Sequence, residues 1–223
     1  MSIPFKPKYI SFDCYGTLTN FQMSPMARKL FADRIAPEDM EAFCNDFRAF
    51  RLDEVTCDWK PYYEVIFESV MRTANQWKVQ FRESDVSAIY EAVPTWGPHA
   101  DVTEGLARIA DKIPLVILSN AMDSQIMSNV EKLGVPFYRV YTAQQAKAYK
   151  PRLQAFEYMI DQLDAKPEDF LHVSSSMRYD LMSADDLGIK DKAFVNRGHE
   201  PGAPAYNYAE IKDIGGLAAL VGL

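Results

Sequence analysis

Four groups of polar residues in this chain could carry chemistry, because each lies at or near the end of an apolar run. The groups are Asp13-Cys14-Tyr15-Gly16-Thr17, Ser119-Asn120, Lys150, and Ser174-Ser175-Ser176 with Asp180. Carboxylates form covalent esters or activate water, and a lysine stabilises negative charge. His99, His172 and His199 show no spacing typical of a nucleophile and its base, and we interpret His172, inside a strand, as a packed core or crevice residue. Asp13 is therefore the strongest candidate nucleophile.

The elements that must position these residues follow from the same apolar runs. Buried strands are predicted at 8–13, 114–119, 138–141, 170–173 and 193–195. Helices are predicted between them, at 123–133, at 151–163 and from the serine cluster to Leu187. Strands separated by helices imply right-handed crossovers and a Rossmann-like, doubly wound parallel sheet of the α/β class. The carboxyl ends of such strands meet at one crevice, where we expect the four polar groups to converge.

The segment between the first and second strands has a different pattern. It shows no strand-like run from Pro25 to Val93, and helices are predicted at 26–35, from Pro37, at 62–77 and at 84–91. A Pro- and Gly-containing linker, 94–98, ends this segment. We predict a Rossmann-like catalytic core of residues 1–20 and 97–223, with a helical cap domain of residues 21–96 inserted after the first strand. Such a cap would exclude water from the nucleophile.

Composition limits the classes of function. The 223 residues carry a net charge of −7, and 48% of them are hydrophobic and 25% charged. This is the composition of a soluble globular protein, and its acidity argues against nucleic acid as a partner. The N-terminus lacks the apolar core of a signal peptide, and no apolar run is long enough to span a membrane. Three cysteines without a CxxC pair fit a reducing compartment, so we expect a cytoplasmic protein without a membrane partner.

The order and spacing of the four groups resemble the haloacid dehalogenase superfamily over essentially the whole chain. The stretch from Phe12 to Leu18 is similar to its first motif, Leu118-Ser119-Asn120 to its second, and Lys150-Pro151 to its third. The stretch from His172 to Ser176, with Asp180, is similar to its fourth. Each match alone is weak, but four in order, each after a predicted strand, are a specific signal.

Two departures indicate the branch of the superfamily. Members that hydrolyse phosphate esters have a second aspartate two residues after the nucleophile and a Gly-Asp in the fourth motif, where Mg²⁺ is held. Here these positions are Tyr15 and Ser174-Ser175. A hydroxyl is a poor replacement for an ionised oxygen ligand of Mg²⁺. The pattern looks like the metal-independent L-2-haloacid dehalogenases, and it implies an enzyme without metal or other cofactor.

By this resemblance, Asp13 attacks carbon 2 of a small 2-substituted carboxylic acid and forms an ester that water hydrolyses to the 2-hydroxy acid. Lys150 would pair with Asp13, and Asp180 would orient or deprotonate the water. Thr17 and Ser175 would hold the carboxylates in place. Ser119 and backbone amides would bind the substrate carboxylate, and Tyr15, beside the nucleophile, is counted among the substrate-binding residues.

The resemblance also implies that residues of the cap receive the leaving halide. Arg48 matches the family's cap arginine, which acts with the asparagine of the second motif, here Asn120. Arg51 lies one helical turn further on and is the alternative. Trp59 is a candidate pocket residue, with an ordinary role in the cap core as its alternative reading. The related dehalogenases are often dimers, so a homodimer is an expectation that rests on the resemblance alone.

Other departures leave the substrate open. Phe156 stands where the dehalogenases commonly have tyrosine, Ser176 adds a third serine, and Asn20 replaces an acidic residue after the first motif. A related metal-free member opens the ring of L-azetidine-2-carboxylate, whose leaving amine would suit Asn20. We therefore expect an (S)-2-haloacid dehalogenase, with an L-azetidine-2-carboxylate hydrolase as the alternative. A Mg²⁺-dependent phosphatase and a non-catalytic binding protein of the same fold are further alternatives.

Overall fold

The computed structural model describes residues 5–223, and within that range six parallel strands form one sheet. Their order across the sheet is β3-β2-β1-β4-β5-β6. The strands are β1 (Tyr9–Phe12), β2 (Leu115–Ser119), β3 (Arg139–Thr142), β4 (Phe170–Ser174), β5 (Asp191–Val195) and β6 (Ala209–Ile211). The predicted α/β class and parallel sheet are confirmed, and β6 is a strand that the sequence analysis did not predict. The order reverses at β1, which is flanked by β2 and β4, so β1 lies at the switch point where such sheets bind ligands.

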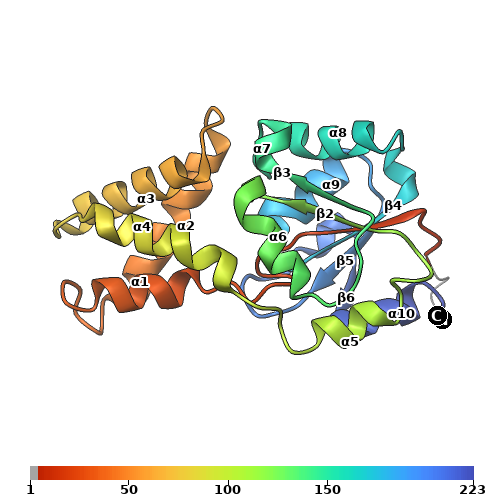
Figure 1. Ribbon diagram of the computed structural model, residues 1–223, viewed down its shortest axis with the longest axis horizontal. Coiled ribbons are helices and arrows are strands. Elements are labelled where there is room, and N and C mark those ends of the chain that lie inside the picture. Colours follow the sequence, from red (N-terminus) through yellow and green to blue (C-terminus); the bar gives the residue numbers. More distant parts are fainter. Residues whose placement is uncertain (1–4) are drawn as a thin grey trace. The chain divides into compact units, whose positions relative to one another are not determined.

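Helices cover both faces of the sheet (Figure 1). Side chains of the strands alternate between the faces, because successive residues of a strand point in opposite directions. One apolar layer joins Ile10 and Phe12 of β1 to α5, α6 and α10, and the other joins Val116 and Leu118 of β2 to α8 and α9. The helices that follow residue 97 are α5 (Val102–Ala107), α6 (Asp123–Glu131), α7 (Ala143–Ala146), α8 (Leu153–Gln162), α9 (Met182–Asp186) and α10 (Leu217–Leu220).

The helix predicted after the serine cluster differs from its prediction. The chain first forms a π-helical turn at Met177–Leu181, in which the Leu181 N–H donates to the Ser176 carbonyl, and α9 follows. Ser176 caps this turn, because its hydroxyl oxygen accepts the Tyr179 N–H. The apolar pattern could not reveal this, because one turn of π-helix and one turn of α-helix place their apolar residues almost alike.

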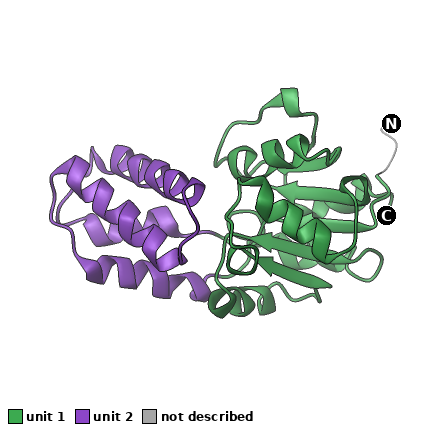
Figure 2. Ribbon diagram, turned by 90° about the horizontal axis from the view of Figure 1, so that it is seen from above, with its two compact units in different colours: residues 1–20, 97–223 green, residues 21–96 purple. Residues whose placement is uncertain are grey.

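Contacts divide the chain into two units, one of residues up to Asn20 with Gly97–Leu223 and one of Phe21–Trp96 (Figure 2). The division falls at the residues where the sequence suggested a boundary. Helices make up the second unit, and α2 packs on α3 and α3 on α4. They are α1 (Met23–Phe31), α2 (Met40–Thr56), α3 (Tyr62–Trp77) and α4 (Glu83–Ala92). The first two begin three residues from their predicted starts, and their buried faces include Phe31, Phe43 and Phe47.

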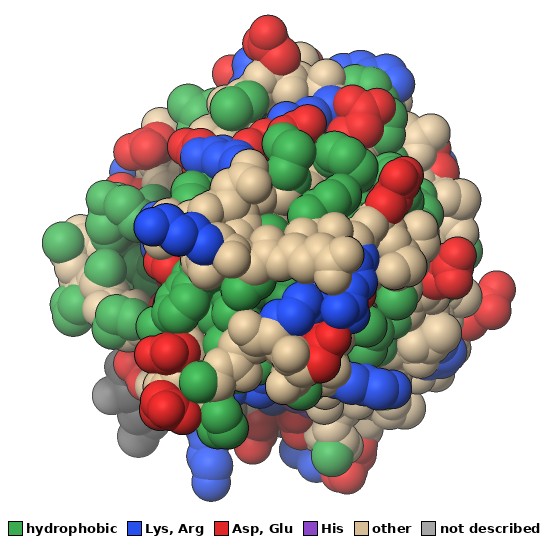
Figure 3. Space-filling view, turned by 90° about the vertical axis from the view of Figure 1, so that its left-hand side faces the viewer, with side chains coloured by type: hydrophobic (Ala, Val, Ile, Leu, Met, Phe, Trp, Pro, Cys, Tyr) green, Lys and Arg blue, Asp and Glu red, His purple; other side chains and the backbone are tan. Residues whose placement is uncertain are grey.

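On the surface drawn in Figure 3, acidic, basic and hydrophobic side chains are interspersed. Across residues 5–223, no helix is both long and apolar enough to cross a membrane.

Candidate active site

The candidate nucleophile, Asp13, directly follows β1 and begins a tight turn. Gly16 in this turn has a φ of +100°, a conformation that residues with a side chain rarely adopt. The turn brings Thr17 back onto Asp13, and the Thr17 hydroxyl donates to Asp13 Oδ2 at 2.6 Å. Thr17 Oγ1 also accepts the backbone N–H of Ser175 at 2.8 Å and lies 3.1 Å from Ser175 Oγ. The turn after β1 and the end of β4 are thus joined at the carboxylate.

Lys150 lies between the two candidate catalytic carboxylates. Its ammonium group donates to Asp13 Oδ1 at 2.9 Å and to Asp180 Oδ1 at 2.6 Å, and its side chain is only 1% exposed. Its backbone is held by Asn120, which donates to the Lys150 carbonyl and accepts the Lys150 N–H. The structure therefore gives Asn120 a task that the sequence analysis did not foresee, the placement of the lysine.

Asp180 comes from the π-helical turn and is fully buried. Its two oxygens have different surroundings. Oδ1 accepts hydrogen bonds from Lys150 and from His172 Nε2, the latter at 3.1 Å. Oδ2 is buried and makes no hydrogen bond to any residue of 5–223. Because buried carboxylate oxygens are normally satisfied, Oδ2 is the atom of this site best placed to accept a proton or hold a water.

The pKa values of the three groups follow from burial and mutual charge. Burial raises the pKa of Asp13 above its ordinary value, against the opposing charge of Lys150. For Asp180, burial is outweighed by the Lys150 charge and the His172 hydrogen bond, so the pKa of Asp180 lies below its ordinary value. Burial opposes the charge of Lys150, but the two carboxylates raise the pKa of Lys150 above its ordinary value. Lys150 therefore keeps its charge, and Asp180 ionises before Asp13.

Two further residues of the predicted site lie at the same edge of the sheet. Ser119 ends β2, and its buried hydroxyl makes no hydrogen bond to any described residue. Tyr15 follows the nucleophile, and its hydroxyl donates to Asn129 of α6 at 2.9 Å. The neighbouring Cys14 is no rival nucleophile, because burial raises the pKa of its thiol to about 12.

His172, expected to be a packed core or crevice residue, is buried and contacts the second carboxylate. Its Nε2 bonds to Asp180, and its Nδ1 lies 2.8 Å from the hydroxyl of Ser11. A signal for this was present in the sequence. Ser11 stands two residues before Asp13, and His172 stands two residues before Ser174. Because side chains alternate along an extended chain, each lies on the same face of the sheet as that polar residue. The register that pairs Ser11 with His172 could not be derived from that signal.

Of the remaining predicted residues, Arg48, Arg51 and Trp59 lie in the second unit, and Asn20 is the last residue before it. Arg48 is exposed on α2, and Trp59 is half-buried after it, both in the second unit. Arg51 is buried there, with its guanidinium over the rings of Phe21 and Phe47 at 5.4 and 5.1 Å. Asn20 is exposed at the end of the first segment of the core. Contacts of Arg48, Trp59 and Asn20 with a substrate stay predictions.

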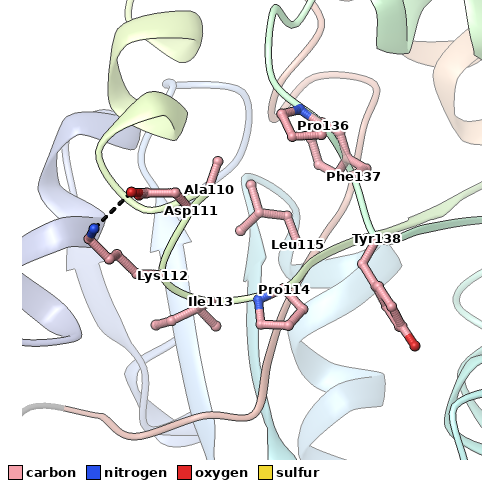
Figure 4. Close-up of a pocket in the computed structure, with 9 residues that line it drawn as sticks. All are labelled: Ala110, Asp111, Lys112, Ile113, Pro114, Leu115, Pro136, Phe137 and Tyr138. Atoms are coloured by element: carbon pink, nitrogen blue, oxygen red, sulfur yellow. Dashed lines mark hydrogen bonds and ion pairs between the residues drawn. The ribbon is translucent and has the colours of Figure 1, made fainter.

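A separate pocket lies away from this cluster. It is lined by the loops that enter β2 and β3, around Leu115 and Tyr138, so it opens at the amino ends of these strands (Figure 4). The charged side chains that line it, Asp111 and Lys112, pair with each other at 2.7 Å. It offers no free charged group for chemistry, whereas the cluster at the carboxyl edge offers several.

The cluster can supply a nucleophilic carboxylate, a fixed positive charge and a second carboxylate with one oxygen free. Among residues 5–223, no group of three or more His, Cys, Asp or Glu side chains is arranged to hold a metal ion. A parallel α/β sheet with an aspartate after β1, a lysine beside it and an acid after β4 fits the class of enzymes in which an aspartate acts as nucleophile.

Comparisons with known proteins agree with this class. Residues 7–188 match the family of haloacid dehalogenase-like hydrolases, so the chain belongs to that family and is a hydrolase. This confirms the superfamily that the motifs indicated. The chain is 23% identical over 209 residues to (S)-2-haloacid dehalogenase 4A of Burkholderia cepacia, an alignment that covers 90% of this chain and 87% of that protein.

Solved structures show the same fold. The L-2-haloacid dehalogenase of Xanthobacter autotrophicus with chloropropionic acid covalently bound is similar with a TM-score of 0.77 and 19% identity, over 97% of this chain and 99% of that chain. A HAD-hydrolase of Bacillus subtilis bound to magnesium is similar with a TM-score of 0.81 and 14% identity, over 98% of this chain and 100% of that chain. At these identities the likeness establishes the fold.

Proposed function

We propose that this hydrolase acts without a metal ion on small 2-substituted carboxylic acids, and that its substrates are (S)-2-haloacids. The observation that carries the proposal is the buried Lys150 ammonium shared by Asp13 and Asp180. The Lys150 side chain thus places a positive charge beside the nucleophile, where a metal ion would otherwise be needed. The similarity to an (S)-2-haloacid dehalogenase and to a structure with chloropropionic acid covalently bound supports the substrate class.

In the first step, a carboxylate oxygen of Asp13 attacks carbon 2 of the acid. A carbon–oxygen bond forms, the carbon–halogen bond breaks, and the halide leaves with both electrons of that bond. Attack from the face opposite to the halide inverts carbon 2. Lys150 and Thr17 hold Asp13 in one orientation, which reduces the entropy cost of reaching the reactive geometry. The same ammonium attracts the anionic substrate.

In the second step, water adds to the carbonyl carbon of the Asp13 ester. Its proton passes to Asp180 Oδ2 and then to the departing oxygen of the 2-hydroxy acid. The Asp13 carboxyl group then releases a proton to solvent and is ready for another cycle. The free Oδ2 of Asp180 supports this role, since its partner oxygen Oδ1 already accepts two hydrogen bonds.

The substrate contacts belong to the same proposal. The buried hydroxyl of Ser119 supports a role in binding the substrate carboxylate, because it makes no hydrogen bond within the described residues. Tyr15, Asn120, Asn20, Arg48 and Trp59 complete the proposed set. Thr17 orients the Asp13 carboxylate, and Ser175 acts through Thr17, whose hydroxyl oxygen accepts the Ser175 N–H.

Halide release from L-2-chloropropionate, measured with and without chelator, tests this function. We expect the same rate in both conditions, and a loss of at least about a thousandfold in Asp13→Asn, because an amide is a poor nucleophile. Ring opening of L-azetidine-2-carboxylate without halide release would instead identify the alternative substrate. Chelator-sensitive hydrolysis of an aryl phosphate would identify a phosphatase and contradict the proposal.

A further inference from the structure

Two polar side chains, Ser11 and His172, lie beside an apolar layer of the core. On the face of the sheet covered by α8 and α9, the neighbours of Ser11 and His172 include Val116, Leu118 and Phe170. Ser11 and His172 are directly opposite each other in the parallel pairing of β1 and β4, and both are 0% exposed. A buried polar group without a hydrogen bond costs free energy. The hydrogen-bond partners of Ser11 and His172 therefore indicate the role of the two residues.

The hydrogen bonds of His172 determine its tautomer. Asp180 Oδ1 is a carboxylate oxygen that can only accept, so Nε2 of His172 carries the proton and donates to it. In the neutral ring Nδ1 is then an acceptor, and the Ser11 hydroxyl donates to it at 2.8 Å. The ring of Phe156 packs edge-on against the imidazole, with centroids 5.2 Å apart, and limits its rotation. Ser11 and Phe156 therefore fix the position and orientation of the Nε2 donor.

This donor points at the second catalytic carboxylate. Lys150 and His172 together occupy Asp180 Oδ1, and this leaves Oδ2 without a partner among the described residues. With Lys150 alone, the carboxylate could rotate about its last side-chain bond and present either oxygen to the ammonium. With two donors in different directions, one orientation is favoured.

We propose that His172, held by Ser11, is a positioning residue that orients the Asp180 carboxylate so that Oδ2 faces the hydrolytic water. The kinetic consequence of this inference rests on the proposed function. The orientation of the Asp180 carboxylate does not depend on the identity of the substrate. Asp13 has its own donors, Lys150 and Thr17. Loss of the imidazole should therefore impair hydrolysis of the ester far more than its formation.

The same contact has an electrostatic consequence. The groups that act on Asp180 are Lys150, His172 and, from the end of β1, the carboxylate of Asp13. Burial raises the pKa of Asp180, whereas Lys150 and the His172 hydrogen bond lower it. Removing His172 removes one of the lowering contacts, so the pKa of Asp180 must rise and its titration must move to higher pH.

Carboxyl-carbon NMR of aspartate-labelled protein measures this without any substrate. The Asp180 signal is assigned by its loss in Asp180→Asn and followed with pH in the wild type, His172→Leu, His172→Gln and Ser11→Ala. We expect a clear upward displacement in His172→Leu and a smaller one in Ser11→Ala. His172→Gln should restore most of the wild-type titration, because its amide nitrogen lies the same number of bonds from the backbone as Nε2. Nitrogen NMR should show the Nε2-protonated ring in the wild type.

Phe170→Leu is the matched control, since Phe170 is buried on the same face of the same strand, two residues before His172. It should lower stability without moving the Asp180 titration. An unmoved titration in a folded His172→Leu protein, or an Nδ1-protonated ring in the wild type, would overturn the proposal. Should His172→Leu fail to fold, the displacement in Ser11→Ala and the tautomer of the wild-type ring carry the decision.

Single-turnover kinetics with L-2-chloropropionate adds the second readout. We expect ester hydrolysis to slow by at least about tenfold in His172→Leu and ester formation by less than about threefold, with recovery in His172→Gln. Equal slowing of both steps would contradict a positioning role. If the wild type forms no ester, the proposed function fails, and the NMR titration still decides the role of His172.

Discussion

At the scale of single residues, the site is defined by one cation between two carboxylates. Asp13, Lys150, Asp180, Thr17 and Ser175 come from three separate parts of the chain, and the structure brings their side chains together. Burial of all five makes their charges and hydrogen bonds strong, because little water screens them. Removing any one should therefore change both stability and chemistry.

Lys150→Met tests the importance of the shared cation. It would leave two buried carboxylates without their common partner, which should destabilise the fold by about 3–5 kcal/mol near neutral pH. The loss should shrink as the pH falls, because protonated carboxyl groups no longer need the ammonium. Denaturant titrations at several pH values measure this, with Lys190→Met, at an exposed lysine, as the control. A loss that does not depend on pH would argue against the shared cation.

The raised pKa of Asp13 predicts the acid limb of activity. A protonated carboxyl group is not a nucleophile, so kcat/KM should fall as the pH drops through a value above the ordinary range of aspartate, about 4. Thr17→Val removes a hydrogen bond that lowers the pKa of Asp13, and it should move the limb to still higher pH. Thr19→Val is the control, because Thr19 lies in the same turn but its hydroxyl contacts Cys14, and it should leave the acid limb in place. Rates that stay constant down to about pH 4 would contradict this assignment.

At the scale of elements, the turn after β1 and the turn after β4 position the chemistry. The first could be predicted, since an aspartate followed by Cys-Tyr-Gly-Thr at the end of an apolar run indicates a sharp turn. The second could not, because nothing in the apolar spacing of Met177–Leu181 distinguishes a π-helical turn from an α-helical one. Asp180 was identified as a candidate all the same, since its type and place after a strand are visible in the sequence.

The partners of Asn120 and His172 were not predictable for a related reason. Asn120 binds the backbone of Lys150, 30 residues away, and His172 binds Ser11 across two strands. Such contacts depend on strand order and register, which the sequence pattern leaves open. The β1–β4 pairing that joins Ser11 to His172 bridges 161 residues of sequence.

Gly16→Ala tests the turn that follows β1. An alanine at this φ of +100° is strained, so we expect a destabilisation of about 1–3 kcal/mol and lower activity from a displaced Thr17. Gly97→Ala is the control, because an added Cβ there meets no atom within 4 Å and the φ lies outside the strained region. Thermal denaturation and halide-release assays of both variants measure the difference. Equal behaviour of the two variants would show that the turn tolerates a side chain.

At the scale of the whole molecule, the chain consists of a parallel α/β unit and a helical unit inserted after its first strand. The sequence could predict this, because strand-like runs are missing between Pro25 and Val93 and return after the linker. It could not decide between Arg48 and Arg51, which lie on the same helix. The structure separates them by burial, with Arg48 exposed and Arg51 packed over two aromatic rings.

This difference predicts opposite effects of two substitutions. Arg48→Ala should leave stability unchanged but lower kcat/KM for a haloacid by at least about tenfold, if the helical unit receives the leaving group. Arg51→Ala should lower stability by about 2 kcal/mol through lost packing and cation–π contacts. Denaturant unfolding and halide-release kinetics of both variants check this. Normal turnover in Arg48→Ala would assign the leaving-group site to other residues.

The covalent ester on Asp13 tests the proposed nucleophile most directly. Asp180→Asn should form the ester but hydrolyse it slowly, so incubation with L-2-chloropropionate in chelator should add one 1-carboxyethyl group to the intact protein. Peptide mass spectrometry should place the group on Asp13, and the Asp13→Asn, Asp180→Asn double variant should stay unmodified. An unmodified Asp180→Asn protein that still releases halide, or modification at another residue, would contradict Asp13 as the nucleophile.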